Sequence, residues 1–421
     1  NIFVIFCLLL IVTPYGSVRL GGAEATPDYS YTGWFAMLFA AGMGIGLLFF
    51  GVSEPMSHFS SSLGGTSMEE GLRTDWAPLG AAGGDEAAAQ RLGMAATIFH
   101  WGLHPWAIYA VVALARALFS FNKGLPLTLR SAFYPIFGER VWGWTGHIID
   151  TLAVFATLFG LATSLGFGAE QTASGLTYLF GSGDAAEGTR AFMGITYGNS
   201  EESGVANNPL LLVLLISGIT AVALVSVVRG LDGGVKVLSE INMGLAALLL
   251  VFVFLVGGPI FLITLFFDSL WAYFQNLFAL SNPFGREDVN FSQGWTAFYW
   301  AWWISWSPFV GMFIARVSRG RTVREFIICV LLIPTLVCVL VTSSDSGSLV
   351  IVTITAGGKV YSPVAQRVFW CIFEGAVAIV LLIGGGLASL QSAVISTGLP
   401  FTLVLLVMCY AIWRGLASEK R

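Results

Sequence analysis

Long apolar runs alternate with short polar loops along most of the chain. A helix needs about 20 apolar residues to cross a bilayer core of about 30 Å. Runs of this kind occupy residues 34–53, 94–119, 147–168, 209–228, 241–266, 294–315, 365–387 and 394–413. Residues 2–12 are apolar but too few to cross, and residues 269–281 predict an amphipathic helix along the membrane interface. The pattern predicts an all-α polytopic membrane protein.

The charges in the loops predict which side of the membrane each loop faces. Acidic residues gather in loops 60–93 and 181–208, whereas Lys and Arg border the other ends of the apolar runs. Basic loops face the cytoplasm. The resulting topology is inconsistent at one place. Arg324 and Lys359 are both predicted on the cytoplasmic side, so two helices must cross the membrane between them, and residues 325–358 are too few for two such helices. We therefore expect a segment to be missing near residues 336–342.

Composition supports the membrane class and excludes others. Hydrophobic residues make up 56% of the chain and charged residues 10%, which leaves no soluble catalytic domain. The net charge of −4 indicates no nucleic-acid partner, and the five cysteines lie in apolar runs as buried small side chains. Four dispersed histidines predict no metal site. His100 and His104 would share a helical face, where packing and hydrogen bonding are favoured over metal binding.

The run from Gly294 to Ala315 is rich in tryptophan. Read as a helix, it places one aromatic stripe at spacings of four, four, three and four: Phe298, Trp302, Trp306, Phe309 and Phe313. Trp303 widens this face, and Pro308 predicts an open or kinked backbone because Ile304 loses its helical partner. A belt at the membrane interface is the alternative, but the stripe is about 22 Å long. An internal lining that holds a donor-free cation is favoured.

Three further stretches could carry chemistry. Gly42, Gly44 and Gly46 interrupt an apolar helix, which predicts either close helix packing or an unwound helix with carbonyls facing a ligand. Residues 342–348 place five hydroxyls and a carboxylate at membrane depth, where oxygen ligands suit a hard cation. The aromatic residues of 101–109 flank a proline and either line the same cavity or form a belt.

Four stretches together resemble the betaine/carnitine/choline transporter family. They are Gly42-Met43-Gly44-Ile45-Gly46 with Phe50 to Pro55, His100 to Tyr109, Trp300 to Met312, and Thr342 to Gly347. The resemblance covers nearly the whole chain. It implies a LeuT-like core of two inverted five-helix repeats after two extra helices, commonly assembled as a homotrimer in the bacterial cytoplasmic (inner) membrane. Residues 1–33 would be the remnant of the accessory helices, whose first helix is absent, and residues 34–421 the core, with repeats at about 34–230 and 237–415.

The resemblance also implies roles for individual residues. An aromatic box around a trimethylammonium group would comprise Trp101, Trp106, Tyr109, Trp303 and Trp306, with Trp302 and Phe298 on the cytoplasmic exit path. One sodium site would comprise the carbonyls of Ala40 and Met43 and the hydroxyls of Thr342 and Ser343. A second family site matches Thr157 and Phe309, but Leu161 stands where its second hydroxyl is expected.

Within the family, two positions favour sodium-coupled uptake of a betaine-like solute. Members resembling proton-coupled choline carriers have Asp where this chain has Gly46, and carnitine exchangers have an Arg that is absent between Asp150 and Gln171. The resemblance thus implies a secondary active transporter, not an enzyme. It would take up glycine betaine or a related quaternary-ammonium or sulfonium solute for osmoprotection, with Na⁺ as coupling ion and no cofactor. Proton-coupled choline uptake and sodium-independent carnitine/betaine exchange are the alternatives.

The expected gap gives a direct test of chain integrity. If the native protein carries a further segment, peptide mapping of the purified protein should recover residues that this sequence lacks between Leu336 and Thr342. An intact mass equal to that of the 421 residues would contradict this prediction and require another topology for the second half.

Overall fold

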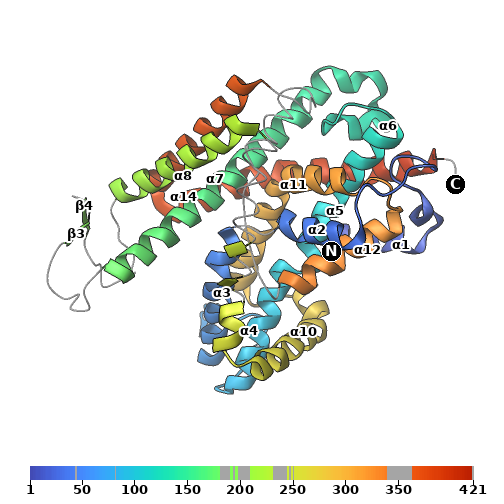
Figure 1. Cartoon of the computed structure of the whole chain (residues 1–421). Coiled ribbons are helices and arrows are strands. Elements are labelled where there is room, and N and C mark those ends of the chain that lie inside the picture. Colours follow the sequence, from blue (N-terminus) through green and yellow to red (C-terminus); the bar gives the residue numbers. More distant parts are fainter. Residues whose placement is uncertain are drawn as a thin grey trace.

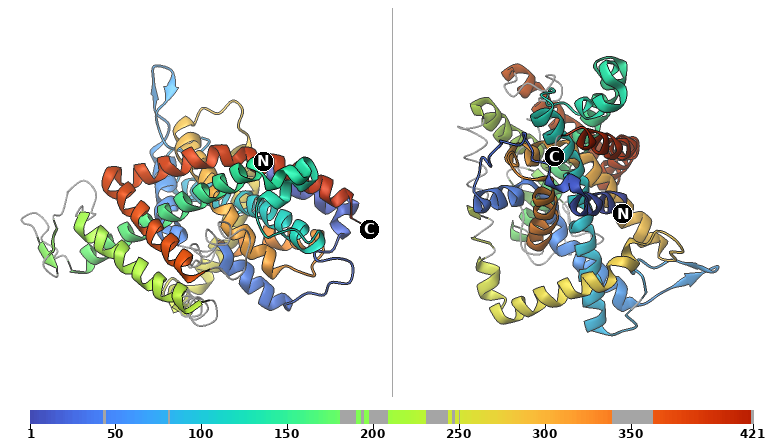
Figure 2. Two further views of the ribbon diagram at one scale, coloured as in Figure 1. Left: turned by 90° about the horizontal axis from the view of Figure 1, so that it is seen from above. Right: turned by 90° about the vertical axis from the view of Figure 1, so that its right-hand side faces the viewer.

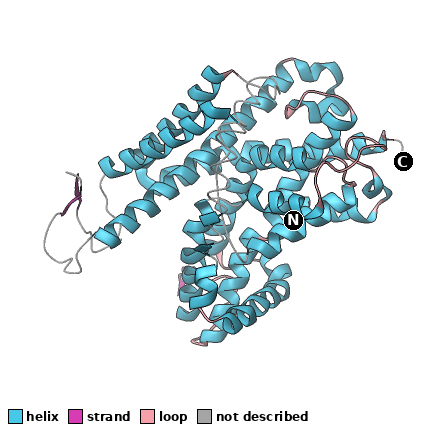
Figure 3. Cartoon of the chain, in the orientation of Figure 1, coloured by secondary structure: helices cyan, strands magenta, loops and turns pink. Residues whose placement is uncertain are grey.

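The computed structural model of the chain is mostly helical (Figure 3). It describes residues 1–42, 45–80, 82–180, 190–192, 195–197, 209–230, 244–245, 248–249, 251–338 and 363–419. In the first half, the elements are α1 (Ile2–Val12), η1 (Pro14–Ser17), α2 (Tyr31–Gly42), α3 (Ile45–Gly64), β1 (Met68–Glu69), β2 (Leu72–Arg73), α4 (Glu86–Trp101), α5 (Leu103–Ala117), η2 (Leu118–Asn122), η3 (Arg130–Phe133), α6 (Tyr134–Phe137), η4 (Gly138–Trp142) and α7 (Trp144–Phe180).

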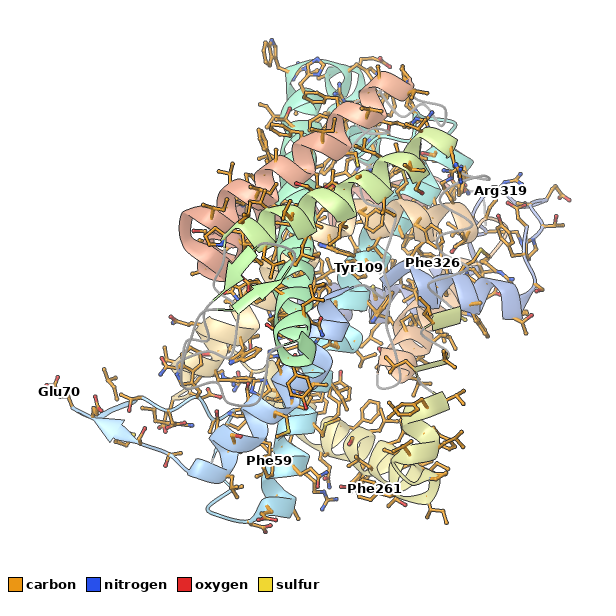
Figure 4. The ribbon with its side chains drawn as sticks, turned by 60° about the vertical axis from the view of Figure 1, so that its left-hand side comes forward. Phe59, Glu70, Tyr109, Phe261, Arg319 and Phe326 are labelled. Atoms are coloured by element: carbon orange, nitrogen blue, oxygen red, sulfur yellow. The ribbon has the colours of Figure 1, made fainter. Side chains whose placement is uncertain are left out.

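The second half continues with a small hairpin and long helices. Its elements are β3 (Arg190–Phe192), β4 (Ile195–Tyr197), α8 (Pro209–Gly230), α10 (Pro259–Ser281), η6 (Asn290–Thr296), α11 (Ala297–Val317), α12 (Val323–Cys338) and α14 (Val364–Ala417). The two hairpins β1–β2 and β3–β4 are antiparallel. Glu70 lies at the projecting tip of the first hairpin (Figure 4).

Helices α5 and α11 pack along each other at the centre of the molecule (Figure 1). Helix α7 packs along α14 and α8 on one side, and α4 packs along α3 and α10 on another (Figures 1 and 2). The largest hydrophobic core cluster joins residues of α5, α7, α11 and the end of α14. Residues from both halves of the chain therefore meet around α5 and α11.

Among the described residues, five helices are long and apolar enough to cross a membrane. They are Glu86–Asn122, Trp144–Leu176, Pro209–Arg229, Pro259–Ser281 and Val364–Ala417. They contain the predicted runs 94–119, 147–168 and 209–228. The last contains both 365–387 and 394–413, and its non-helical backbone at Gly385 and Gly386 lies near the end of the first of these two runs. The predicted run 34–53 is divided between α2 and α3.

The prediction of a separate interfacial helix at 269–281 is wrong. Those residues are the second half of α10, which begins at Pro259. Gly258 has a φ of 82°, a left-handed conformation that stops the preceding helix, and proline is favoured in the first turn of the next. The break therefore lies ten residues earlier than the apolar pattern predicts, inside the run 241–266.

The loops predicted in the cytoplasm lie together. Arg19 forms a β-bridge with Thr322, and the backbone N–H of Leu20 donates to the carbonyl of Arg321. The Arg321 guanidinium lies 4.6 Å from the ring centre of Trp34, which donates its indole N–H to Ser318. The segment around Arg19 and the basic cluster after α11 therefore pack against each other, and their placement on the cytoplasmic side stays a prediction.

Helix α11 is not opened at Pro308, where the sequence predicts an open or kinked backbone. Helix α11 runs from Ala297 to Val317 with Pro308 inside it. The Ser307 hydroxyl donates to the Ile304 carbonyl at 2.7 Å, and this is the oxygen that Pro308 leaves without its helical N–H partner. A side chain next to the proline thus replaces the missing bond, so the tryptophan stripe remains on one continuous helix.

Close contact between α14 and α11 depends on Gly398. A Cβ added there would lie 2.9 Å from the carbonyl oxygen of Ala301 and 3.0 Å from its Cα. Backbone atoms cannot move aside cheaply, so Gly398→Ala should destabilise the protein by about 1–3 kcal/mol and lower the melting temperature in detergent. Gly218→Ala, where a Cβ meets nothing within 4 Å, is the matched control and should cause no loss. Equal melting curves for the two variants would contradict this close contact.

Candidate functional site

The aromatic residues predicted to line an internal site are buried at the centre of the molecule. Tyr109 lies there in Figure 4, on α5, and the stripe lies on the neighbouring α11. Trp302 is 1% exposed and Trp306 8%, whereas Trp271 on α10 is 59% exposed. All of the predicted box and exit-path residues are buried, namely Trp101, Trp106, Tyr109, Phe298, Trp302, Trp303 and Trp306. These rings are therefore buried among the helices, whereas Trp271 lies on the outer surface.

Ring contacts join the residues of the two stretches. Trp101 and Trp303 meet edge to face with centroids 4.8 Å apart, and Tyr109 meets Trp303 at 6.1 Å. Trp106 packs against Tyr109 at 5.4 Å. Helix α4 ends at Trp101 and α5 begins at Leu103, so the break between these helices places Trp101 beside α11.

Along α11 the rings form a continuous series. Trp302 stacks on Trp303 at 5.1 Å and on Phe298 at 5.5 Å. Trp306 meets Trp302 edge to face at 6.4 Å and Phe309 at 5.5 Å. Contacts through Tyr109, Trp303 and Trp302 link Trp106 on α5 to Trp306 on α11.

The indole N–H groups of the box all have acceptors within the protein. Trp302 and Trp306 donate to the carbonyl of Gly160 at 3.3 and 2.9 Å. The remaining three donors are Trp101 to the Glu54 carboxylate, Trp303 to the His100 carbonyl and Trp106 to the Trp101 carbonyl. Each bond fixes the orientation of its ring and satisfies the one polar group of that ring within the protein. The faces of such rings attract a cation electrostatically.

The sequence reasoning missed a buried carboxylate next to the aromatic residues. Glu54 is 0% exposed, and its Oε2 accepts the Trp101 indole N–H at 2.8 Å and the Tyr299 hydroxyl at 2.5 Å. Its Oε1 lies 2.6 Å from His100 Nδ1 and 3.2 Å from His58 Nε2. An ionisable residue inside an apolar run signals function, and the spacing of four between Glu54 and His58 places both on one helix face.

The same cluster corrects the prediction that the histidines are dispersed. Ligand atoms of Glu54, His58 and His100 lie within 4.8 Å of one another and could hold a metal ion. Their mutual hydrogen bonds also account for this arrangement without one. His100 and His104 lie on different helices, because α4 ends at Trp101 and α5 begins at Leu103, but both rings contact Trp300. His104 bonds Asn1, while His100 bonds Glu54 and Thr296, so packing and hydrogen bonding occupy both rings.

The predicted sodium ligands are described only in part. Helix α2 contains Ala40 and ends at Gly42, and α3 resumes at Ile45 and contains Gly46. Met43, Gly44, Thr342 and Ser343 lie outside the described residues, so this site stays a prediction.

The second family site also stays a prediction. Thr157 is buried on α7, and its hydroxyl donates to the Ala153 carbonyl at 2.7 Å. Phe309 is buried on α11 against Trp306, and Leu161 is buried one turn after Thr157. The hydroxyl that the second site requires is therefore absent from position 161, as the sequence indicates.

Comparison with known proteins shows what class of molecule this architecture belongs to. The profile of the betaine/carnitine/choline family of transporters matches residues 1–341 and 337–421. The chain is 60% identical to a glycine betaine/proline/choline transporter of Vibrio parahaemolyticus, with 100% of this chain and 82% of the relative aligned. Two further Vibrio parahaemolyticus relatives are glycine betaine transporter 1 (50% identical, 100% and 85% aligned) and a glycine betaine/proline/choline/ectoine transporter (47%, 100% and 79%).

The molecule is a multi-pass membrane transporter and not an enzyme. It belongs to the betaine/carnitine/choline transporter family. The resemblance seen in the sequence is thereby confirmed.

Proposed function

We propose that this protein takes up glycine betaine, or a related quaternary-ammonium or sulfonium solute, by sodium-coupled symport. The observation that carries the proposal is the buried group of aromatic rings on α4, α5 and α11, whose indole N–H groups are all bonded within the protein. A trimethylammonium group offers no hydrogen-bond donor, so ring faces without free polar edges suit it. In this proposal Trp101, Trp106, Tyr109, Trp303 and Trp306 surround the cation.

The exit path in this proposal follows the stacked pair Phe298 and Trp302. Their centroids lie 5.5 Å apart with nearly parallel rings, directly beside Trp303. The relatives support the class of substrate, since three of them carry names that include glycine betaine. Two of those names also include choline and proline, so proton-coupled choline uptake is the second candidate. Sodium-independent exchange of carnitine or betaine is the third.

Sodium coupling would arise where α2 and α3 meet. Helix α2 ends at Gly42 and α3 begins at Ile45, and a helix interrupted by glycines can supply carbonyls from Ala40 and Met43. Sodium is a hard cation that prefers such oxygen ligands, and the hydroxyls of Thr342 and Ser343 would complete the set. Occupancy would join the two halves of the chain and so raise affinity for the substrate, with reciprocal coupling.

We also propose the architecture that the family implies. It comprises two inverted five-helix repeats assembled as a homotrimer in the bacterial inner membrane, where uptake of compatible solutes serves osmoprotection. The family profile matches in two stretches that meet at residues 337–341, and this supports the proposal that a segment is missing there. The alignment with the 60% identical relative extends over 476 positions against 421 residues in this chain, which gives the same support.

Removal of a box ring tests the site. Trp303→Ala or Trp306→Ala should weaken glycine betaine binding by at least about tenfold, because each lost cation–π contact in a desolvated site contributes about 2 kcal/mol. Trp271→Ala on the exposed side of α10 is the control and should leave binding unchanged. Binding would be measured by calorimetry on purified protein. Equal affinities for all three variants would show that these rings do not hold the substrate.

Coupling is tested by uptake of labelled glycine betaine into proteoliposomes with and without a sodium gradient. Replacing both hydroxyls, Thr342→Ala with Ser343→Ala, should raise the sodium concentration for half-maximal uptake by at least about tenfold, equivalent to about 1.4 kcal/mol. Substrate binding at saturating sodium should change less. Uptake that follows an imposed proton gradient would rule out the sodium mechanism and favour the second candidate, whereas uptake that needs neither ion gradient would favour the third.

A further inference from the structure

One face of α3 is built around a buried carboxylate. Phe50, Glu54 and His58 follow one another at spacings of four, and all three are buried. Phe50 packs edge to face against Tyr299 at 5.5 Å and Trp302 at 5.8 Å. The same face of α3 thus brings an apolar ring and a carboxylate onto the start of α11.

The two oxygens of the Glu54 carboxylate have different partners. Oε1 lies within hydrogen-bonding distance of both histidine rings, whereas Oε2 accepts only from Trp101 and Tyr299. A carboxylate has about four lone-pair sites, so these four partners satisfy it fully. Its orientation is therefore determined by the protein, and the positions of its donors are determined with it.

The two donors on Oε2 come from two different helices, and Trp101 is the one that belongs to the aromatic box. Trp101 ends α4 and meets Trp303 at 4.8 Å, whereas Tyr299 lies on α11 and stacks on Trp303 at 5.9 Å. Trp101 and Tyr299 also contact each other edge to face at 5.6 Å. One carboxylate oxygen therefore holds two rings that both rest on the central ring of the box.

A second connection reaches Trp303 itself. The indole N–H of Trp303 donates to the backbone carbonyl of His100 at 2.8 Å, and His100 Nδ1 lies 2.6 Å from Glu54 Oε1. The other ring nitrogen of His100 lies 2.9 Å from the Thr296 hydroxyl at the start of α11. Through His100, Glu54 is thus linked to the third ring as well.

We propose that Glu54 is a positioning residue for substrate recognition, which fixes the angle between the rings of Trp101, Tyr299 and Trp303. This inference rests on the proposed function, because it assumes that Trp101 and Trp303 contact the substrate cation and that Tyr299 supports Trp303 by stacking on it. A cation is attracted to the face of an aromatic ring. A ring whose side-chain torsion angles change presents its edge to the cation instead, and the attraction is lost. Hydrogen bonds to a carboxylate are shorter and about twice as strong as neutral ones, which suits this role.

The first test removes the hydrogen bond between Tyr299 and Glu54 and keeps the aromatic ring of residue 299. Tyr299→Phe deletes the hydroxyl that donates to Glu54, and we expect the glycine betaine concentration for half-maximal uptake to rise at least about fivefold. The maximal rate at saturating substrate should stay within about twofold. Tyr134→Phe is the matched control, since Tyr134 donates its hydroxyl to Glu139 at 2.7 Å at an exposed site.

The carboxylate is tested in the same way. Glu54→Gln retains an acceptor oxygen and should therefore raise the half-saturation concentration less than Glu54→Ala, with Glu139→Gln as control. In the Glu54→Ala background, Tyr299→Phe should add no further effect, because the shared acceptor is already gone. If Glu54→Ala does not fold, Tyr299→Phe and Glu54→Gln still decide the question.

Two results would overturn the proposal. One is an unchanged half-saturation concentration in Tyr299→Phe, whether or not the melting temperature falls. The other is an effect of Tyr299→Phe that is as large in Glu54→Ala as in the unmodified protein. Trp303→Ala, measured in the same assay, distinguishes a failure of the proposed role of Glu54 from a failure of the proposed substrate site. If it weakens uptake while Tyr299→Phe does not, only the role of Glu54 is wrong, and if neither does, the proposed substrate site is wrong.

Discussion

The need to satisfy polar groups where water is excluded determines how the centre of this protein is built. Tryptophan provides large ring faces, but each indole brings one N–H that must find an acceptor when it is buried. A single carbonyl, that of Gly160 on α7, accepts from both Trp302 and Trp306. Glycine is needed at this position, because a Cβ there would lie 2.8 Å from the Trp306 ring. The stripe on α11 is thus anchored to α7 by hydrogen bonds as well as by packing.

Local pattern was sufficient to find the aromatic surface. The spacing of Phe298, Trp302 and Trp306 places them on one face of a helix whatever surrounds it. Their burial depends on the packing of α5 and α7 against α11. The existence of helix α11 could also be predicted from the sequence pattern. Its continuity through Pro308 could not, because that depends on whether the Ser307 hydroxyl turns back to the Ile304 carbonyl. Rotamer choices of this kind are decided by packing and leave no periodic signal.

The hydrogen-bond partners of Glu54 could not be predicted from the sequence for a different reason. Glu54, Trp101 and Tyr299 lie far apart in the sequence and meet only because α3, α4 and α11 pack together. A sequence shows that a carboxylate in an apolar run needs compensation, but not which donors supply it. The break at Gly258 shows a similar limit, since apolar content continues unchanged through a turn that backbone conformation alone determines.

Helix α3 connects the two parts of the proposed mechanism. Its first residues follow the glycines that would expose sodium-binding carbonyls, and Glu54 lies eight residues after Gly46, about 12 Å along the same helix. Backbone hydrogen bonds make a helix stiff along its axis, although Pro55 leaves the Gly51 carbonyl of α3 without its helical N–H partner. A shift of α3 on ion binding would therefore move the carboxylate that holds Trp101 and Tyr299. Energetic coupling between ion and substrate then needs no direct contact between them, only one rigid element whose position both of them bias.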